Sequence, residues 1–206
     1  RKPYVTKTDT LERRENGRPL MRGSLRNRDT NLWNNNYYVL YGKNLGAPRD
    51  SKIFECKEKI IIRQTSDKII ATIITENIIC RKNLHILISE MVDHRFILGV
   101  LNSKLTNFYY QQINPEKGEV LAEVKKTHVE QLPIPKITSE NQQLHDDLVK
   151  LVEQMLKAKK EEQNAQSDHE KNLYKNLTDS LDYKINNLVY KLYNLTPEEI
   201  DLVEKS

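Results

Sequence analysis

The sequence of 206 residues has few of the residues that build covalent or metal-held scaffolds. Its two cysteines, Cys56 and Cys80, are too few for a disulfide framework and form no CxxC pair. We therefore expect a protein of the reducing cytoplasm. No apolar run approaches the roughly 20 residues of a membrane-spanning helix, and the first residues lack the apolar block of a signal peptide. No membrane partner is expected, and the missing initiator Met suggests a piece of a longer chain.

Common catalytic motifs are also absent. The sequence has no GxGxxG, GxxxxGK[ST], GxSxG or HExxH, which leaves dinucleotide-binding, P-loop, hydrolase and zincin functions without support. The set Cys80, His85 and His94 matches no known zinc spacing, so no metal site is predicted. Asp50 followed by Glu55-x-Lys57 resembles the metal-binding motif of some nucleases. The spacing leaves no room for the turn that separates the two strands of such sites, so a solvated charged segment is favoured over a nuclease.

Charge is unevenly distributed along the chain. The net charge is +4, but residues 1–52 hold 12 Lys and Arg against 5 Asp and Glu, whereas residues 138–206 hold 9 against 14. A basic front and an acidic back indicate two surfaces with different partners, and the basic one suits a phosphate backbone. The alternative is a solvated surface of no special function.

The first two thirds of the sequence predict a β-rich domain. Aromatic and β-branched residues predict a strand at 37–41, a hairpin of 60–65 and 68–75 around Ser66-Asp67, and a strand at 84–88. Apolar residues at three- and four-residue spacing predict one helix over 96–112. Short extended pieces at 120–124 and 129–134 follow, and Pro133 and Pro135 mark a domain boundary.

The last third predicts helices. Ser139 with Gln142 forms the pattern of a capping box before an apolar stripe over 144–155, and a second stripe covers 173–192. The polar tract 159–168 either extends the first helix or turns it. Thr196 and Glu199 predict a terminal helix with Pro197 at its first position. The expected architecture is α+β: a mixed domain over 1–137 followed by an antiparallel helical hairpin over 138–206.

The basic front has the composition of a DNA-reading surface. Six arginines fall within sixteen residues, and asparagines and aromatic residues surround them. Arginine forks match guanine, and Asn or Gln match adenine in the major groove. The triplet Arg63-Gln64-Thr65 is a second polar group, which an ordinary hairpin end explains equally well.

Several segments occur in an order that resembles a known family. They are MRGSLRNRD (21–29), YYVLYG (37–42), KIIIRQT (59–65), LGVLNSKL (98–105), FYY (108–110), EQLPIP (130–135) and INNLVYKLYNLT (185–196). The sequence resembles the TaqI-like C-terminal specificity domain, the target recognition domain of type IIG restriction-modification enzymes and adenine-specific DNA methyltransferases. The family usually has an acid at Asn186 or Asn187 and often a Gly at Asn194. No NPPY motif for a flipped adenine is present.

The resemblance implies a non-catalytic module that recognises double-stranded DNA for a catalytic methyltransferase domain of the same longer chain. The parent would use S-adenosylmethionine, with Mg²⁺ as a second candidate cofactor, and whether it also cuts DNA is open. Lys104, Lys125 and Lys126 are candidate phosphate contacts, whereas Asn102 and Ser103 either contact DNA or brace their helix. The alternatives are a protein-interaction or dimerisation module, with a dimer through the C-terminal helices, and half of a type I specificity subunit. The DNA-contacting candidates are Arg22, Arg26, Arg28, Trp33, Asn35, Arg63, Gln64, Thr65, Asn102, Ser103, Lys104, Lys125 and Lys126.

Overall fold

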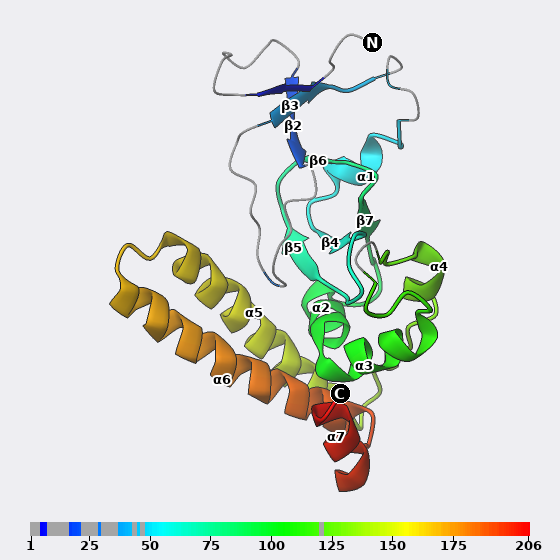
Figure 1. Ribbon diagram of the computed structural model, residues 1–206, viewed down its shortest axis with the longest axis vertical. Coiled ribbons are helices and arrows are strands. Elements are labelled where there is room, and N and C mark those ends of the chain that lie inside the picture. Colours follow the sequence, from blue (N-terminus) through cyan, green and yellow to red (C-terminus); the bar gives the residue numbers. More distant parts are fainter. Residues whose placement is uncertain are drawn as a thin grey trace.

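The computed structural model describes residues 5–7, 17–21, 29, 37–42, 45, 48–119 and 122–206. Two small sheets lie toward one end of the molecule, and helices form the other end (Figure 1). This combination confirms the α+β class.

The first sheet is built mainly from the front of the chain. Its strand order is β1 (Val5–Lys7), β3 (Tyr37–Leu40), β2 (Gly17–Met21) and β6 (Ile79–Cys80). The β6 strand pairs with β2 in parallel, whereas the other pairs are antiparallel. The predicted strand at 37–41 is confirmed, and β1, β2 and β6 carry too little apolar pattern to be predicted.

The second sheet contains the predicted hairpin. Its central strand β4 (Lys59–Arg63) pairs antiparallel with β5 (Ala71–Ile74) on one side and with β7 (Leu84–Leu87) on the other. The second arm of the hairpin begins later than predicted, at Ala71. The reason is that two preceding amides bond side chains: Lys68 N–H donates to Ser66 Oγ at 3.1 Å and Ile69 N–H to Asn107 Oδ1 at 2.8 Å.

The central strand is covered on both faces, which explains its uninterrupted apolar run. Successive side chains of a strand point to opposite faces. Ile60 and Ile62 belong to a core that includes the helices, whereas Ile61 belongs to a second core with Phe54 of the short helix α1 (Lys52–Glu55). All three isoleucines are buried. The sheet therefore lies between two apolar cores.

The predicted helix over 96–112 is two helices, α2 (His94–Asn102) and α3 (Lys104–Ile113). The break is at Ser103, which is extended and whose Oγ accepts a hydrogen bond from Thr106 N–H at 3.1 Å. Such N-caps satisfy one of the free amides at a helix start. A further turn of helix, α4 (Lys126–Val129), lies between the two predicted extended pieces and overlaps the second only at Val129.

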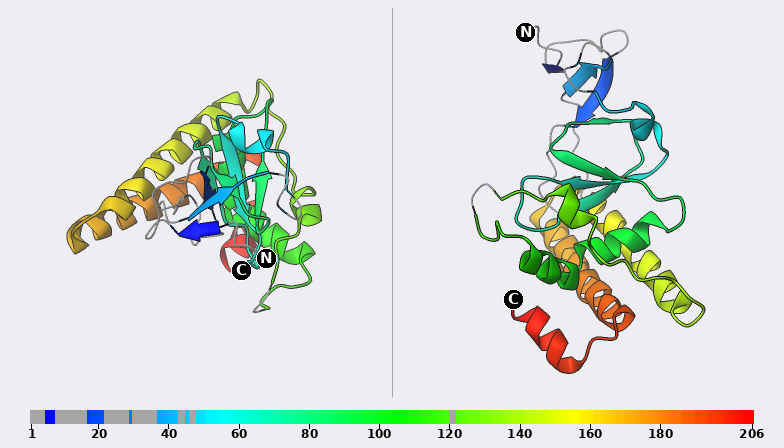
Figure 2. Two further views of the ribbon diagram at one scale, coloured as in Figure 1. Left: turned by 90° about the horizontal axis from the view of Figure 1, so that it is seen from above. Right: turned by 90° about the vertical axis from the view of Figure 1, so that its right-hand side faces the viewer.

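Helices α5 (Gln142–Asn164) and α6 (Asp168–Leu192) run side by side as the predicted hairpin (Figures 1 and 2). The capping box at Ser139 is not formed, because Asn141 is the N-cap of α5 and makes no side-chain cap bond. Helix α5 takes up most of the polar tract, and a capping box of Ser167 and Glu170 starts α6. The box of Thr196 and Glu199 before α7 (Pro197–Glu204) is confirmed.

The apolar core runs without interruption from the β-rich part into the helical hairpin. Helix α2 meets α5 so closely at Gly99 that a Cβ there would lie 2.9 Å from Val152 Cγ2. Leu148, Val152 and Leu181 share one core with Ile60 and the buried residues of α2. A division into two domains at residue 137 stays a prediction, but the two parts pack as neighbours.

The outer half of the second apolar stripe is not buried. Leu173 and Leu177 of α6 are 57% and 45% exposed, whereas Leu181 and Ile185 are in the core.

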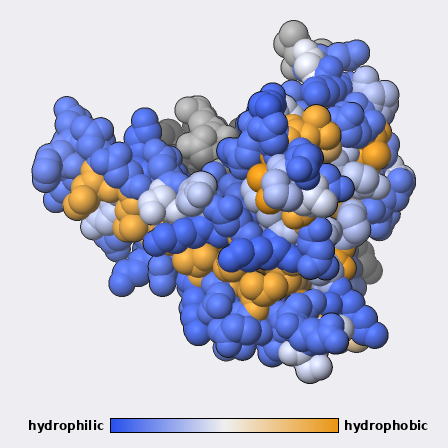
Figure 3. Space-filling view, turned by 90° about the horizontal axis from the view of Figure 1, so that it is seen from below, coloured by the Kyte–Doolittle hydropathy of each residue, from blue (hydrophilic) through white to orange (hydrophobic). Residues whose placement is uncertain are grey.

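The lower face of the molecule shows apolar spots within a hydrophilic surface (Figure 3). Among the described residues, no helix is both long and apolar enough to cross a membrane.

The two departures from the family pattern, in α6 and just after its C-cap Tyr193, have structural explanations. Asn194 has a φ of 54°, a left-handed conformation that glycine adopts without strain, and its N–H bonds Lys191 O while Leu195 N–H bonds Tyr190 O. Asn186 is buried, and its Oδ1 accepts a hydrogen bond from Lys104 N–H at 2.8 Å, at the start of α3. A carboxylate oxygen is an equivalent acceptor at a helix start.

We expect Asn186→Ala to lower the free energy of unfolding by about 1–2 kcal/mol, because it removes the acceptor of the partly buried Lys104 N–H at the start of α3. Urea denaturation measures the effect. The matched control is Asn187→Ala, since the Asn187 side chain donates to Tyr183 O of its own helix, and we expect at most about 0.5 kcal/mol there. Equal losses in the two variants would contradict the inter-helical role of Asn186.

Candidate nucleic-acid interface

The triplet Arg63-Gln64-Thr65 lies at the end of β4 and is held by main-chain bonds on two sides. Gln64 N–H donates to Asn83 O at 3.0 Å, and Gln64 O accepts from Val124 N–H at 2.6 Å. The Arg63 Nε donates to Thr65 Oγ1 at 3.2 Å, and the Gln64 Nε2 donates to Glu123 Oε2 at 3.3 Å. These polar side chains therefore stand on a fixed backbone rather than on a loose hairpin end.

A turn that the sequence pattern did not single out lies beside this triplet. Arg63 pairs with Leu84 in the sheet register, so the residues before Leu84 flank Gln64. Arg81 and Lys82 in this turn are exposed. Sequence reasoning missed them because at least sixteen positions separate them from the triplet, and only the pairing of β4 with β7 brings them together.

Lys125 and Lys126 lie near the triplet because the preceding residue, Val124, is bonded to it. Val124 N–H donates to Gln64 O, and Val124 O accepts a hydrogen bond of 2.7 Å from His85 Nε2. Lys125 Nζ forms an ion pair of 2.6 Å with Glu116 Oε1, and Lys126 Nζ lies 3.3 Å from Glu130 Oε1. The hydrogen bond from Lys125 lowers the pKa of the Glu116 carboxyl and raises that of Lys125. The cations are near the triplet, but acids of the protein compete for them.

The candidates at the α2–α3 junction have different surroundings. Asn102 Oδ1 accepts from Ala71 N–H at 3.1 Å, while its Nδ2 donates to Ala71 O at 3.1 Å and to Asp29 Oδ1 at 2.7 Å. Ser103 Oγ caps α3 and donates to Val100 O at 2.7 Å. Both residues are buried. Both residues therefore make bonds that brace the junction, and Asn102 bonds the main chain of Ala71 as a neighbouring strand would. A DNA contact by either residue stays a prediction.

Lys104 is directed toward α7. Its Nζ forms an ion pair with Glu204, whose Oε1 also accepts a bond of 2.6 Å from the Tyr190 hydroxyl. The bond from Lys104, followed by that from Tyr190, lowers the pKa of the Glu204 carboxyl. Lys104 also lines a groove of about 540 Å³ between the β4–β5 turn and the helical hairpin, in which Asp29, Asp67, Asp179 and Asp182 outnumber the lysines. This acidic lining does not favour a phosphate.

Five candidates lie outside the described residues: Arg22, Arg26, Arg28, Trp33 and Asn35. The residue that precedes them, Met21, is described. It pairs in parallel with Cys80, and its O accepts a hydrogen bond of 3.1 Å from Arg81 N–H.

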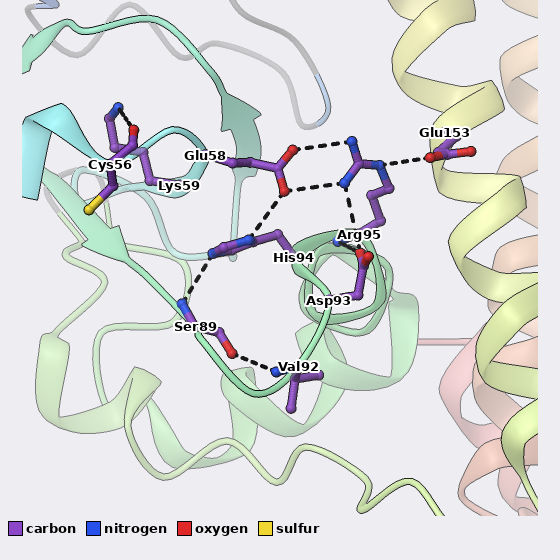
Figure 4. Close-up of polar contacts among 9 residues, drawn as sticks. All are labelled: Cys56, Glu58, Lys59, Ser89, Val92, Asp93, His94, Arg95 and Glu153. Carbon is purple, nitrogen blue, oxygen red and sulfur yellow. Dashed lines mark hydrogen bonds and ion pairs between the residues drawn. The ribbon is translucent and has the colours of Figure 1, made fainter.

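A polar network lies between the segment before β4, the start of α2 and α5 (Figure 4). Arg95 of α2 pairs with both carboxylate oxygens of Glu58, and its Nε forms an ion pair of 3.0 Å with Glu153 of α5. His94 Nε2 accepts from Ser89 N–H at 3.1 Å, so its Nδ1 carries the proton that faces Glu58 Oε1 at 3.2 Å. The network connects the start of β4 to α2 and α5, and its groups are all engaged structurally.

The metal and nuclease alternatives gain no support. His85 and His94 bond separate main-chain groups, and burial raises the pKa of the Cys80 thiol to about 11. Asp50 accepts from Lys52 N–H at the start of α1, and Glu55 pairs with Arg18. Within the described part of the chain, no three His, Cys, Asp or Glu residues are grouped to hold a metal ion.

Comparison with known proteins gives a family. No curated protein matches the chain. Among solved structures, the chain is similar to a type IIL restriction-modification enzyme, MmeI, in complex with DNA, with a TM-score of 0.54 and 13% sequence identity. The match covers 89% of this chain and 29% of MmeI, so this chain spans less than a third of that enzyme. The TaqI-like C-terminal specificity domain matches residues 18–134, more than half of the sequence. The chain therefore belongs to the family of TaqI-like C-terminal specificity domains.

Proposed function

We propose that this chain selects a short double-stranded DNA sequence for a restriction-modification enzyme. The observation that carries the proposal is the gathering of Arg63, Gln64 and Lys125 at one end of the β4–β7 sheet in a specificity-domain family. Arg and Gln are suited to read guanine and adenine edges, and Lys to hold phosphates.

The internal bonds of these residues define how binding would proceed. Gln64 donates to Glu123, so its amide would exchange that carboxylate for an adenine edge. Lys125 would share its charge between Glu116 and a phosphate. Such exchanges lower affinity for all sequences and favour duplexes that offer a full set of replacement bonds.

The proposal extends to the parent enzyme. MmeI is a restriction-modification enzyme with a much longer chain, which supports a catalytic domain as the covalent partner of this module. We propose an adenine-specific methyltransferase that uses S-adenosylmethionine, with Mg²⁺ if the parent also cuts DNA. We propose that both cofactors bind the catalytic part of the parent enzyme and not this module.

Lys125→Gln in the full-length enzyme is expected to weaken binding to cognate and random duplexes alike and to reduce the slope of log K against log salt by about 1. Glu116→Gln, which frees Lys125 from its ion pair, is expected to tighten binding to both duplexes. Fluorescence anisotropy titrations at several salt concentrations measure both effects.

The same titrations separate the proposal from its alternative. The exposed Leu173 and Leu177 favour a protein-interaction or dimerisation role for the helical hairpin. A full-length enzyme that binds no duplex at low salt would reject DNA recognition and leave that role. Unchanged binding by both the Lys125 and the Glu116 variants would reject only this part of the DNA surface.

A further inference from the structure

The turn between β6 and β7 brings together parts of the chain that the sequence keeps apart. On one side, Asn83 O accepts a bond from Gln64 N–H; on the other, Arg81 N–H donates to Met21 O. Met21 is the last residue before the arginine-rich stretch 22–28 of the sequence. The turn thus adjoins the triplet Arg63-Gln64-Thr65 in space, and it bonds the residue that precedes the arginine-rich stretch in the sequence.

The backbone of this turn is fixed by one arginine. The Arg49 guanidinium donates through Nη2 to Arg81 O at 2.9 Å and to Leu84 O at 3.1 Å. Leu84 N–H also donates to Arg81 O at 3.0 Å. Arg49 is itself held, because its main-chain O accepts a bond of 2.6 Å from the Tyr41 hydroxyl. A turn fixed in this way loses little conformational entropy when it binds a ligand.

The cations on the turn differ from the other cations near the triplet. Lys125 and Lys126 are paired with glutamates. The side chains of Arg81 and Lys82 are exposed, and within the described residues no hydrogen bond or ion pair engages them. Two adjacent uncompensated cations on a rigid turn attract a phosphate backbone without having to break an internal ion pair.

We propose that Arg81 and Lys82 contact DNA phosphates and that Arg49 positions them, on a turn that bonds Gln64 of the triplet on one side and Met21 on the other. This inference rests on the proposed function and adds a docking element to it. Phosphate contacts fix the register of a protein on the duplex. The turn would therefore set which bases Arg63 and Gln64 face.

The test is made in the full-length enzyme with the double variant Arg81→Gln/Lys82→Gln. Loss of two phosphate contacts is expected to reduce the salt slope by about 2 and to weaken cognate and random duplexes by a similar factor, about tenfold or more. The charge-matched control is Lys184→Gln/Lys191→Gln on the exposed face of α6, which is expected to leave both quantities unchanged.

Arg49→Lys separates positioning from contact, because it keeps the charge but shortens the side chain, which draws the donor away from the Arg81 and Leu84 carbonyls that Arg49 Nη2 bonds. We expect weaker binding with an unchanged salt slope, and thermal melting by circular dichroism confirms that each variant is folded. If the wild type binds DNA and the double variant keeps its slope and affinity, the turn is not a phosphate contact. A reduced slope for Arg49→Lys overturns the positioning role. A wild type without DNA binding rejects the proposed function itself.

Discussion

Arg63→Gln in the full-length enzyme is expected to remove most of its preference for the cognate duplex, with little effect on random DNA. A bidentate contact from arginine to guanine is worth about 1–3 kcal/mol of discrimination, or roughly 5- to 150-fold in relative affinity. The hydrogen bond from Arg63 Nε to Thr65 Oγ1 orients the guanidinium at the strand end. Competition binding with single-base variants of the cognate duplex measures the loss and identifies the base.

The control for Arg63 is Lys191→Gln, which removes one charge from the exposed surface of α6 and should leave discrimination intact. A variant that weakens cognate and random duplexes by the same factor would contradict base reading and make Arg63 a phosphate contact. Retained discrimination and retained affinity would exclude Arg63 from the interface.

Asn102→Ala is expected to lower the free energy of unfolding by about 3 kcal/mol. The Asn102 amide bonds both main-chain groups of Ala71 and the carboxylate of Asp29, and Asn102 is only 4% exposed. Its removal leaves several buried polar groups without partners, each costing about 1–3 kcal/mol. Chemical denaturation measures the loss, with Asn187→Ala as the control.

The same variant distinguishes the two roles considered for Asn102. A bracing residue changes stability but not the discrimination between duplexes by the folded protein. Loss of discrimination at full stability would restore Asn102 as a DNA contact and contradict the internal bonding described above.

Local patterns predicted the elements whose stability is local. The KIIIRQT segment became β4, because its apolar side chains can be buried on both faces of a strand. The capping box of Thr196 and Glu199 formed as predicted. The box at Ser139 did not form, because α5 begins at Gln142 with Asn141 as its N-cap, two residues after Ser139.

Contacts between distant segments could not be predicted. The apolar pattern continues through Ser103 and therefore does not reveal the break between α2 and α3. Asn186 of α6 stabilises the new helix start, because its Oδ1 accepts a hydrogen bond from Lys104 N–H. Likewise, Leu173 and Leu177 continue the apolar stripe of Leu181 along α6. They stay exposed, because they are not part of the core in which Leu181 packs with the buried residues of α2. Periodicity indicates which face of a helix is apolar, not how far its partner extends.

The sequence by itself determined the α+β class, the helical hairpin, the charge asymmetry and the family likeness, because these depend on composition, periodicity and motif order. The tertiary structure decided which polar residues act together. It gave Asn102 and Ser103 internal bonds that brace the α2–α3 junction, paired Lys104 with Glu204, and placed the β6–β7 turn beside Gln64. The physical reason is that hydrogen bonds and ion pairs require contact in space, which strand register and helix packing create between residues far apart in the chain.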